Sequence, residues 1–338
     1  MSVRPLTEYC TLNMGQSPDS KTYNTQGNGL PFYQGNADFG ETNPITRVWC
    51  SAPVKVAEEG DILISVRAPI GAMNMAVERC CIGRGLAALT PIRNKCSKQF
   101  LYYALQSKVD SLIAQGTGST FKAISKKVLE ATCIPAYSTI EQEQIAETIG
   151  HVDNTIAAKR KQLALLDQLV KSRFIELFGD PIKNTQHRPT TAFVNVVTMQ
   201  RGFDLPVQDR EQSGNIPVYG SNGVLDHHNQ AKVCNGGVIT GRSGTIGKVF
   251  YTKGAYWPLN TTLFSVDTHE NNIIYLAHLL RMFNLARFTE GTGVPTLNRN
   301  KFHSAPIIDV PIDEQNQFAA FVEQTDKSKL CSKMEVAA

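Results

Sequence analysis

The stretch TIEQEQIAETIGHVDNTIAAKRKQLALLDQLVKSRFIELFG, residues 139–179, decides the fold of this chain. Apolar residues recur in it at alternating spacings of three and four, the pattern of a coiled-coil seam. The seam consists of Ile149, Val152, Ile156, Leu163, Leu166, Val170 and Leu177, with Lys159 and Arg173 as its only polar positions. Ser138 and Glu141 have the spacing of a capping box at its start, and Gly179 ends it. The pattern predicts one helix of roughly 60 Å, at about 1.5 Å per residue.

A seam this narrow must pair with another apolar surface, and the end of the chain offers a candidate. We expect a second helix from about Asp313, with Phe318, Val322 and Leu330 on its apolar side. The two helices are expected to form an antiparallel coiled coil. The second helix, as read from the sequence, is shorter than the first.

The chain also repeats itself. Gly-Thr-Gly at residues 116–118 returns at residues 291–293, and Glu-Gln at 141–142 returns at 314–315, so the offsets are 175 and 173. The apolar run that leads to Arg67 matches the run that leads to Arg242, again at an offset of 175. Several landmarks in the same order indicate a duplication rather than chance.

The repeats predict an α+β fold built from two pseudo-symmetric mixed α/β domains. Each copy contains short β-rich segments with Gly and Asn turns, a helical stretch (residues 99–114 and 272–288) and then a long helix. We therefore divide the chain into a first domain at 1–138, a long helix at 139–179, a second domain at 180–312 and a second helix at 313–338.

Composition narrows the function classes. A net charge of +4 among 338 residues is mild, so a nucleic-acid role requires basic residues that gather on one face. The first 15 residues do not resemble a secretory signal, and no apolar window is long enough for a membrane span. The eight cysteines form no C-x-x-C pair, so we expect reduced, mostly buried thiols in a cytoplasmic protein.

Three segments resemble one known family. They are GDILISVRAPIG at residues 60–71, CIGRGLAA at 81–88, and the run from Ile134 to Gly179. Together they are similar to the specificity subunits of type I restriction-modification systems, in which two target recognition domains alternate with long helices. The second copy departs from the pattern, because it has Arg242-Ser243-Gly244 where the first has Arg-Ala-Pro.

The resemblance implies a non-catalytic subunit that recognises a bipartite target in double-stranded DNA. Its implied partners are methyltransferase subunits, expected to number two, and restriction subunits with motor and nuclease activity. S-adenosylmethionine, ATP and magnesium are expected on those partners, and no cofactor or metal is expected in this chain. Two alternatives stay open: a shortened family variant that needs a second subunit, and a coiled-coil scaffold for protein interactions.

No catalytic motif contradicts this interpretation. The nearest phosphate-loop match, residues 241–249, has one residue too many and Val249 where a hydroxyl is needed. A methyltransferase signature and a G-x-S-x-G elbow are both absent from the sequence.

DNA contacts are expected from basic residues beside Gly-rich turns, where the backbone can approach a ligand closely. The candidates for phosphate contacts are Arg67, Arg84, Lys122, Lys126 and Lys127 in the first copy, and Arg242, Lys248, Arg299 and Lys301 in the second. The candidates for base contacts are Tyr219, Ser221 and Asn222.

Overall fold

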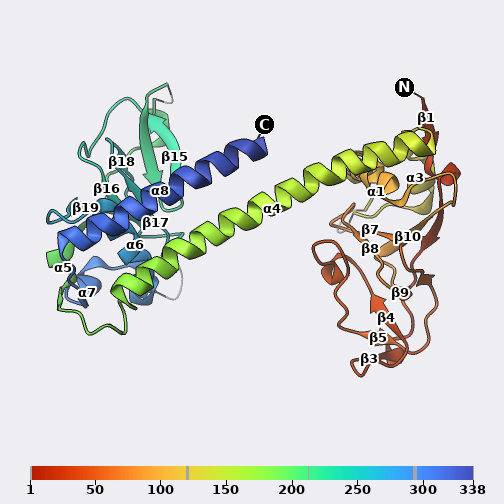
Figure 1. Cartoon of the computed structure of the whole chain (residues 1–338), viewed down its shortest axis with the longest axis horizontal. Coiled ribbons are helices and arrows are strands. Elements are labelled where there is room, and N and C mark those ends of the chain that lie inside the picture. The colour runs from red at the N-terminus through yellow and green to blue at the C-terminus, as the bar shows by residue number, and fades with distance from the viewer. Residues whose placement is uncertain (1, 119–121, 212, 292–294, 338) are drawn as a thin grey trace. The chain divides into compact units, whose positions relative to one another are not determined.

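The computed structural model describes residues 2–118, 122–211, 213–291 and 295–337. The chain forms two compact units, residues 1–155 and 156–338, and the boundary falls inside the longest helix, α4 (Thr139–Phe178) (Figure 1). Each unit has hydrophobic cores of its own. None of the helices in the described ranges is long and apolar enough to cross a membrane. The Gly-Thr-Gly loops of the repeat lie partly outside the described residues.

Unit 1 is built on two sheets. The first has the order β2 (Cys10–Met14), β10 (Leu86–Pro91), β7 (Ile62–Ser65), β8 (Met73–Met75), all antiparallel. The second has the order β3 (Tyr23–Asn24), β5 (Trp49–Cys50), β4 (Leu30–Tyr33), β9 (Cys80–Ile82), β6 (Val56–Ala57). Within it β4 and β9 are parallel. A short pair joins β1 (Val3–Pro5) to β11 (Cys133–Pro135).

The helical stretch predicted at residues 99–114 is interrupted. It contains α1 (Lys98–Gln106) and α2 (Val109–Ala114), and α3 (Lys126–Ala131) follows later in the unit. The buried side of α1 packs on the first sheet through Phe100, Leu101 and Leu105. Successive residues of β10 point to opposite faces of the sheet, and both faces are buried: Ala87 and Leu89 join the core under this helix, whereas Leu86 and Ala88 join a second core.

Unit 2 repeats this architecture. Its main sheet has the order β13 (Thr198–Arg201), β19 (Thr262–Asp267), β16 (Gly237–Gly241), β17 (Val249–Thr252). Its second sheet has the order β15 (Gly223–His228), β14 (Ile216–Gly220), β18 (Trp257–Pro258), and β14 and β18 are parallel. The smaller pairs are β12 (Thr190–Ala192) with β22 (Pro306–Ile308) and β20 (Thr289–Glu290) with β21 (Thr296–Leu297).

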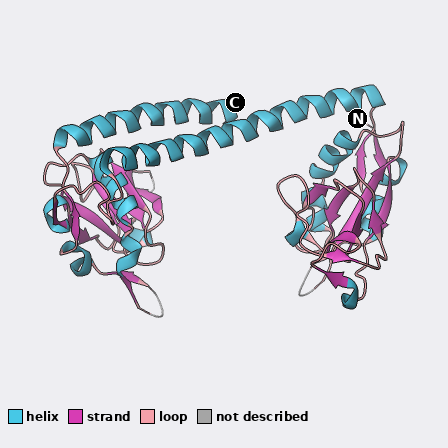
Figure 2. Cartoon of the chain, turned by 60° about the horizontal axis from the view of Figure 1, so that its bottom comes forward, coloured by secondary structure: helices cyan, strands magenta, loops and turns pink. Residues whose placement is uncertain are grey.

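The helices of unit 2 are α5 (Phe193–Val196), α6 (Ile273–Phe283), α7 (Arg299–His303) and α8 (Ile312–Ala337), besides the end of α4. The stretch predicted at 272–288 ends early as an α-helix, because Asn284 takes a left-handed conformation (φ 54°) and only a 3-10 turn follows. Figure 2 shows helix and strand mixed in both units. The predicted fold class of two mixed α/β domains joined by a long helix is confirmed.

The two main sheets have the same topology. When the four strands of each sheet are numbered in chain order, the first strand pairs with the fourth, the fourth with the second, and the second with the third. The registers give residue equivalences: Ser65 pairs with Leu86 in unit 1, and Gly241 pairs with Thr262 in unit 2. The offset at this point is therefore 176, and the duplication inferred from sequence is visible strand by strand.

Helix α8 pairs with the second half of α4, as Figure 1 and Figure 2 both show. Asp167 Oδ1 accepts from Lys329 Nζ at 2.8 Å, the Arg173 guanidinium lies 6.0 Å from the Phe321 ring, and the rings of Phe174 and Phe318 are 5.4 Å apart. Residue numbers rise along α4 as they fall along α8, so the two helices are antiparallel.

Only part of the predicted seam is buried where α4 and α8 pack together. Val170 is buried, while Ile156, Leu163, Leu166 and Leu177 are half-buried, and Phe318 and Val322 are buried on α8. Ile149 and Val152 belong to unit 1, and Val152 is 53% exposed, so the expectation that Val152 packs in the coiled coil is wrong for this chain. Leu330 is also exposed, because the α8 seam continues through Thr325, Lys329 and Ser332 instead.

A buried glutamine fastens each long helix to its own unit. Gln142 Oε1 accepts from Ser97 N at 2.9 Å, just before α1, and its Nε2 donates to Lys95 O and Tyr137 O. Gln315 Oε1 accepts from Asn272 N at 2.9 Å, just before α6, and its Nε2 donates to Asn271 Oδ1 and Val310 O. Both side chains are fully buried.

The predicted capping box is also present at the start of α4. Ser138 N and Ser138 Oγ both donate to Glu141 Oε2, at 2.8 and 2.7 Å. These bonds lower the pKa of Glu141.

Candidate nucleic-acid interface

Each unit has a surface pocket beside its pair of parallel strands. The first pocket has a volume of about 460 Å³ and is lined by the loop after β4, the loop after β7, and the turn between β9 and β10. The second pocket has a volume of about 720 Å³ and is lined by the loop after β14, the turn between β18 and β19, and the segment 204–210. Neither was identified as a cavity by the sequence.

The hydrogen bonds that shape the two pockets correspond. Gly83 N donates to Tyr33 O at 2.8 Å in unit 1, and Leu259 N donates to Tyr219 O at 2.9 Å in unit 2. The turn then closes through Leu86 N to Gly83 O, and through Thr262 N to Leu259 O. Arg84 and Asn260 therefore occupy the same position in the two units.

A glycine backs each turn. A side chain at Gly15 would place its Cβ 2.2 Å from Gly83 O, and one at Gly202 would place it 2.2 Å from Leu259 O. Because any side chain at these two positions would clash with the turn, only glycine allows the chain after β2 and after β13 to approach the turns this closely. The equivalent loops Gly35–Asn36 and Ser221–Asn222 line the other side of the two pockets.

The first pocket presents two arginines. Arg67 and Arg84 both line it and are exposed, and the Arg84 backbone is held by a bond from its N–H to Ser17 Oγ at 3.2 Å. Among the described residues, no hydrogen-bond acceptor or carboxylate is paired with the Arg84 guanidinium. Lys122 lies beside this pocket, because its carbonyl accepts from Ala68 N at 3.0 Å. Two of the predicted cations thus line the pocket, and the backbone of a third lies beside it.

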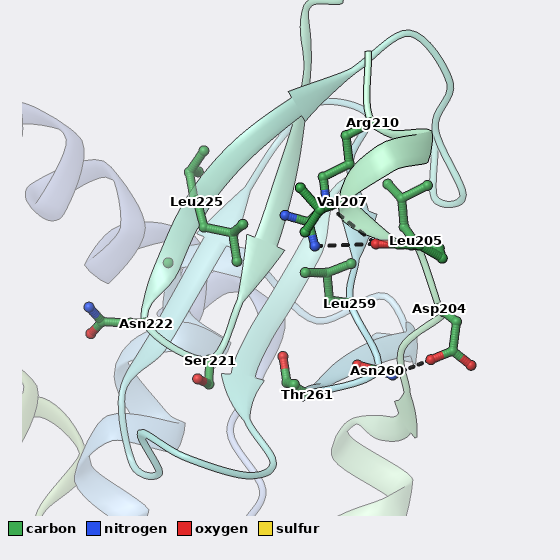
Figure 3. Close-up of a pocket in the computed structure, with 13 residues that line it drawn as sticks. Asp204, Leu205, Val207, Arg210, Ser221, Asn222, Leu225, Leu259, Asn260 and Thr261 are labelled. Atoms are coloured by element: carbon green, nitrogen blue, oxygen red, sulfur yellow. Dashed lines mark hydrogen bonds between the residues drawn. The ribbon is translucent and has the colours of Figure 1, made fainter. Parts of the chain in front are cut away.

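The second pocket is built from amides, hydroxyls and aliphatic side chains (Figure 3). Ser221 and Asn222, two of the predicted base-contacting residues, line it, and Asn222 Oδ1 accepts from Lys248 Nζ at 2.6 Å. Asn260 Nδ2 donates to Asp204 Oδ1 at its rim. Exposed Val207 and Leu225 supply apolar surface. Such a surface can contact base edges through hydrogen bonds and the thymine methyl group through apolar contact.

Arg210 holds one wall of the second pocket rather than facing a ligand. Its Nε and Nη2 donate to Leu205 O at 3.3 and 3.2 Å (Figure 3). Its Nη1 lies 3.5 Å from Asp226 Oδ2. This arrangement fixes the loop that carries Asp204 and Val207.

The structure does not support the prediction that Tyr219 reads bases. Its side chain is 8% exposed and its ring packs edge-on against Tyr256 at 5.8 Å. Burial raises the pKa of its hydroxyl, so the group stays a neutral phenol. Tyr219 therefore belongs to the core behind the second pocket, and its carbonyl positions the turn.

The remaining predicted cations are dispersed. Lys126 on α3 forms an ion pair with Glu130 at 3.2 Å, and Lys127 is exposed on the same helix. Lys301 forms an ion pair with Glu290, and its hydrogen bond lowers the pKa of that carboxyl. Arg242 and Arg299 line a third cavity, in unit 2.

The pairing of Arg67 with Arg242 expected from the sequence is wrong by one residue. Val66 N donates to Gly85 O in unit 1, and Arg242 N donates to Thr261 O in unit 2, so Arg242 is equivalent to Val66 and Ser243 to Arg67. Sequence reasoning also missed Asn260 and Arg201. The offset of 176 from strand register identifies Asn260 as the counterpart of Arg84, whereas the apolar run that leads to Arg67 and Arg242 indicates an offset of 175.

Comparisons with known proteins point to one family. The model of the type I restriction modification DNA specificity domain matches residues 1–168 and 195–334. A putative type I restriction enzyme MjaX specificity subunit of Methanocaldococcus jannaschii is 41% identical over 164 residues, which cover 48% of this chain and 39% of that protein. The MjaIX specificity subunit of the same organism is 26% identical over 185 residues, covering 51% and 43%. The matched part thus spans about two fifths of these relatives.

Two solved structures are also similar. The HsdS subunit from Thermoanaerobacter tengcongensis is 48% identical, with a TM-score of 0.44 over 48% of this chain and 39% of that one. The type I restriction-modification S subunit from M. genitalium is 15% identical, with a TM-score of 0.68 over 99% of this chain and 92% of that one. The second likeness extends to the whole fold.

Proposed function

Because the chain belongs to the family defined by the type I restriction modification DNA specificity domain, we propose that it is the subunit that recognises a bipartite DNA target. In this proposal unit 1 reads one half-site and unit 2 reads the other. The chain itself is non-catalytic, and it brings methyltransferase and restriction subunits to the target. S-adenosylmethionine, ATP and magnesium act on those partners.

One observation carries the proposal: the same pocket occurs twice, with the same backbone frame and different side chains. Arg84 occupies the position of Asn260, and Gly35 occupies that of Ser221. An arginine fork suits guanine, which offers two acceptors on its major-groove edge, whereas an asparagine amide suits adenine. Two pockets that share a backbone frame but carry different side chains are suited to two half-sites of different sequence.

Phosphate contacts supply the affinity in this proposal. Lys122 and Arg67 lie beside the first pocket, and Lys248 lies at the second. Because such contacts release counterions, binding must weaken steeply as salt is raised. They position the duplex without reading its sequence.

Helices α4 and α8 are the proposed docking surface for the methyltransferase subunits. Leu165 and Leu169 on α4 are 55% and 48% exposed although they lie in unit 2, where the neighbouring seam residues pack on α8. Their spacing of four puts both on one face of the helix. An exposed apolar face on a paired helix is suited to a partner protein.

The test is reconstitution with the methyltransferase subunits, followed by mapping of methylated adenines on a DNA library. We expect one bipartite sequence to be methylated, and no methyl transfer by the isolated chain. Exchange of residues 1–138 for the first domain of another family member should change one half-site only. Changes in both halves, or salt-independent DNA binding, would contradict the proposal and favour a protein-interaction scaffold.

A further inference from the structure

A third cavity gathers three arginines in unit 2. It has a volume of about 400 Å³, and its walls include Arg201, Arg242 and Arg299 together with Asn298 and Asn300. Among the described residues that line it, Glu290 is the one carboxylate, and that group is already bound by Lys301 and Asn298. The cavity therefore has an excess of positive charge.

Strand pairing, backbone hydrogen bonds and a helix cap fix the backbone at the three arginines. Arg201 ends β13 opposite Leu263 of β19. Arg242 N donates to Thr261 O, and Arg242 O accepts from Leu297 N, both at 2.8 Å. Arg299 begins α7, which Asn298 caps by accepting from Asn300 N at 3.1 Å. In the described part of the chain, these three guanidinium groups form no ion pair.

Unit 1 differs at all three equivalent positions. Met14 pairs with Ala87 as Arg201 pairs with Leu263, so Met14 is the counterpart of Arg201. Val66 is the counterpart of Arg242 and is buried. Lys126 begins α3 as Arg299 begins α7, and its charge is paired with Glu130. The cluster is thus a property of unit 2.

We propose that this arginine cavity binds a backbone phosphate of the half-site that unit 2 reads, an inference that rests on the proposed function. Guanidinium groups match the geometry of phosphate oxygens and bind them through paired hydrogen bonds. The side-chain amides of Asn298 and Asn300 supply further donors. Since the described residues of unit 1 form no equivalent cluster at these positions, we expect this particular phosphate contact in one half-site only.

The first test measures DNA affinity of the complex with methyltransferase subunits between about 50 and 200 mM salt. The triple variant R201Q/R242Q/R299Q should bind the cognate duplex at least tenfold more weakly at low salt. Its salt slope should fall by about one phosphate contact, or roughly 0.9 in log–log units. The triple lysine variant should keep most of the slope, since it keeps the charge.

Two controls separate this cavity from general basicity. Lys253→Gln removes one exposed positive charge that is paired with Glu323, and its slope should match the wild type. Lys126→Gln in unit 1 should change the slope less than Arg299→Gln in unit 2, although the two positions are equivalent. Equal changes in salt slope for Lys126→Gln and Arg299→Gln would contradict the inference that the phosphate site belongs to unit 2. Fluorescence of Trp257 checks that unit 2 stays folded in each variant.

The second test replaces single phosphates of the duplex by neutral methylphosphonates. The wild-type complex should lose affinity at one phosphate in the second half-site, and the R201Q/R242Q/R299Q complex should be insensitive at that phosphate. Competition by inorganic phosphate without any sensitive position in the duplex would identify a site for free anions and overturn the inference. A wild-type complex without bipartite specificity would refute the proposed function itself. Bipartite specificity with an unchanged salt slope in the triple variant would refute only the arginine cavity.

Discussion

Replacement of Gln315 by leucine should destabilise unit 2 and leave unit 1 unchanged. Leucine fills a similar volume, but it leaves Asn272 N, Asn271 Oδ1 and Val310 O without their partner. Val310 is buried, and an unpaired buried carbonyl costs about 1–3 kcal/mol. The other two groups are half-buried, so water compensates part of their loss. We expect a loss of about 3 kcal/mol in the free energy of unfolding of unit 2.

The assay uses the two tryptophans of the chain. Trp49 lies in unit 1 and Trp257 in unit 2, so single-tryptophan variants W49F and W257F report on one unit each. With a slope of about 2–3 kcal/mol per molar urea, the midpoint reported by Trp257 should fall by about 1 M. Gln142→Leu should shift only the Trp49 transition, because Gln142 holds α4 to unit 1.

The matched control is Gln317→Leu, an exposed position two residues along the same helix, which should change stability by less than about 0.5 kcal/mol. The reasoning fails if Gln315→Leu costs less than about 1 kcal/mol. It also fails if both tryptophans report the same shift, because the two glutamines would then not act on separate units.

Three further predictions concern recognition, spacing and pH. In methylation mapping, Arg84→Ala should weaken the base preference at one position of one half-site, and Asn260→Ala should do so at one position of the other. Each variant should lose about 1–3 kcal/mol of discrimination between bases. Arg79→Ala is the control. Seven residues inserted after Thr155 keep the phase of the heptad and add roughly 10 Å of helix. The preferred spacer, which is the stretch of DNA between the two half-sites, should therefore lengthen by about three base pairs. An unchanged spacer would contradict this prediction. Burial, with Arg281 as a second cause, lowers the pKa of His278 to about 4, below its unfolded value of 6.5. Stability of unit 2 should therefore be full above pH 6.5 and be about 2 kcal/mol lower at pH 5, and His278→Gln should remove that difference between urea titrations at pH 7.5 and 5.

The long helix was predictable because its periodicity extends over 40 residues, which outweighs any single substitution. Its partner was predictable only in part. Lys329 is polar, and the sequence does not show that Asp167 lies opposite it, so the exposed Leu330 was mistaken for a seam residue. The repeated Glu-Gln pair was visible from the sequence, but the hydrogen bonds of Gln142 and Gln315 depend on carbonyls that only the fold brings near.

In the candidate site, too, the sequence indicated local features but not those that depend on the tertiary structure. Arg67, Arg84, Ser221 and Asn222 became candidates because cations and amides beside Gly-rich turns are a local signal, and all four line the two pockets. Tyr219 gave the same signal but is buried, and burial is a tertiary property. Asn260 was missed because its equivalence to Arg84 depends on strand register, and a one-residue shift in the alignment conceals it.

The frame of the two pockets has an evolutionary consequence. Arg84 and Asn260 each sit in a turn that closes through the backbone groups of their neighbours, and neither side chain is needed to close it. Under the function proposed above, a mutation at these positions alters which sequence is recognised at little cost to folding. Glycines such as Gly15 and Gly202, which the backbone of the turn approaches closely, have no comparable freedom. New specificities can then arise by single substitutions at the turns, while the strands beneath them stay under constraint.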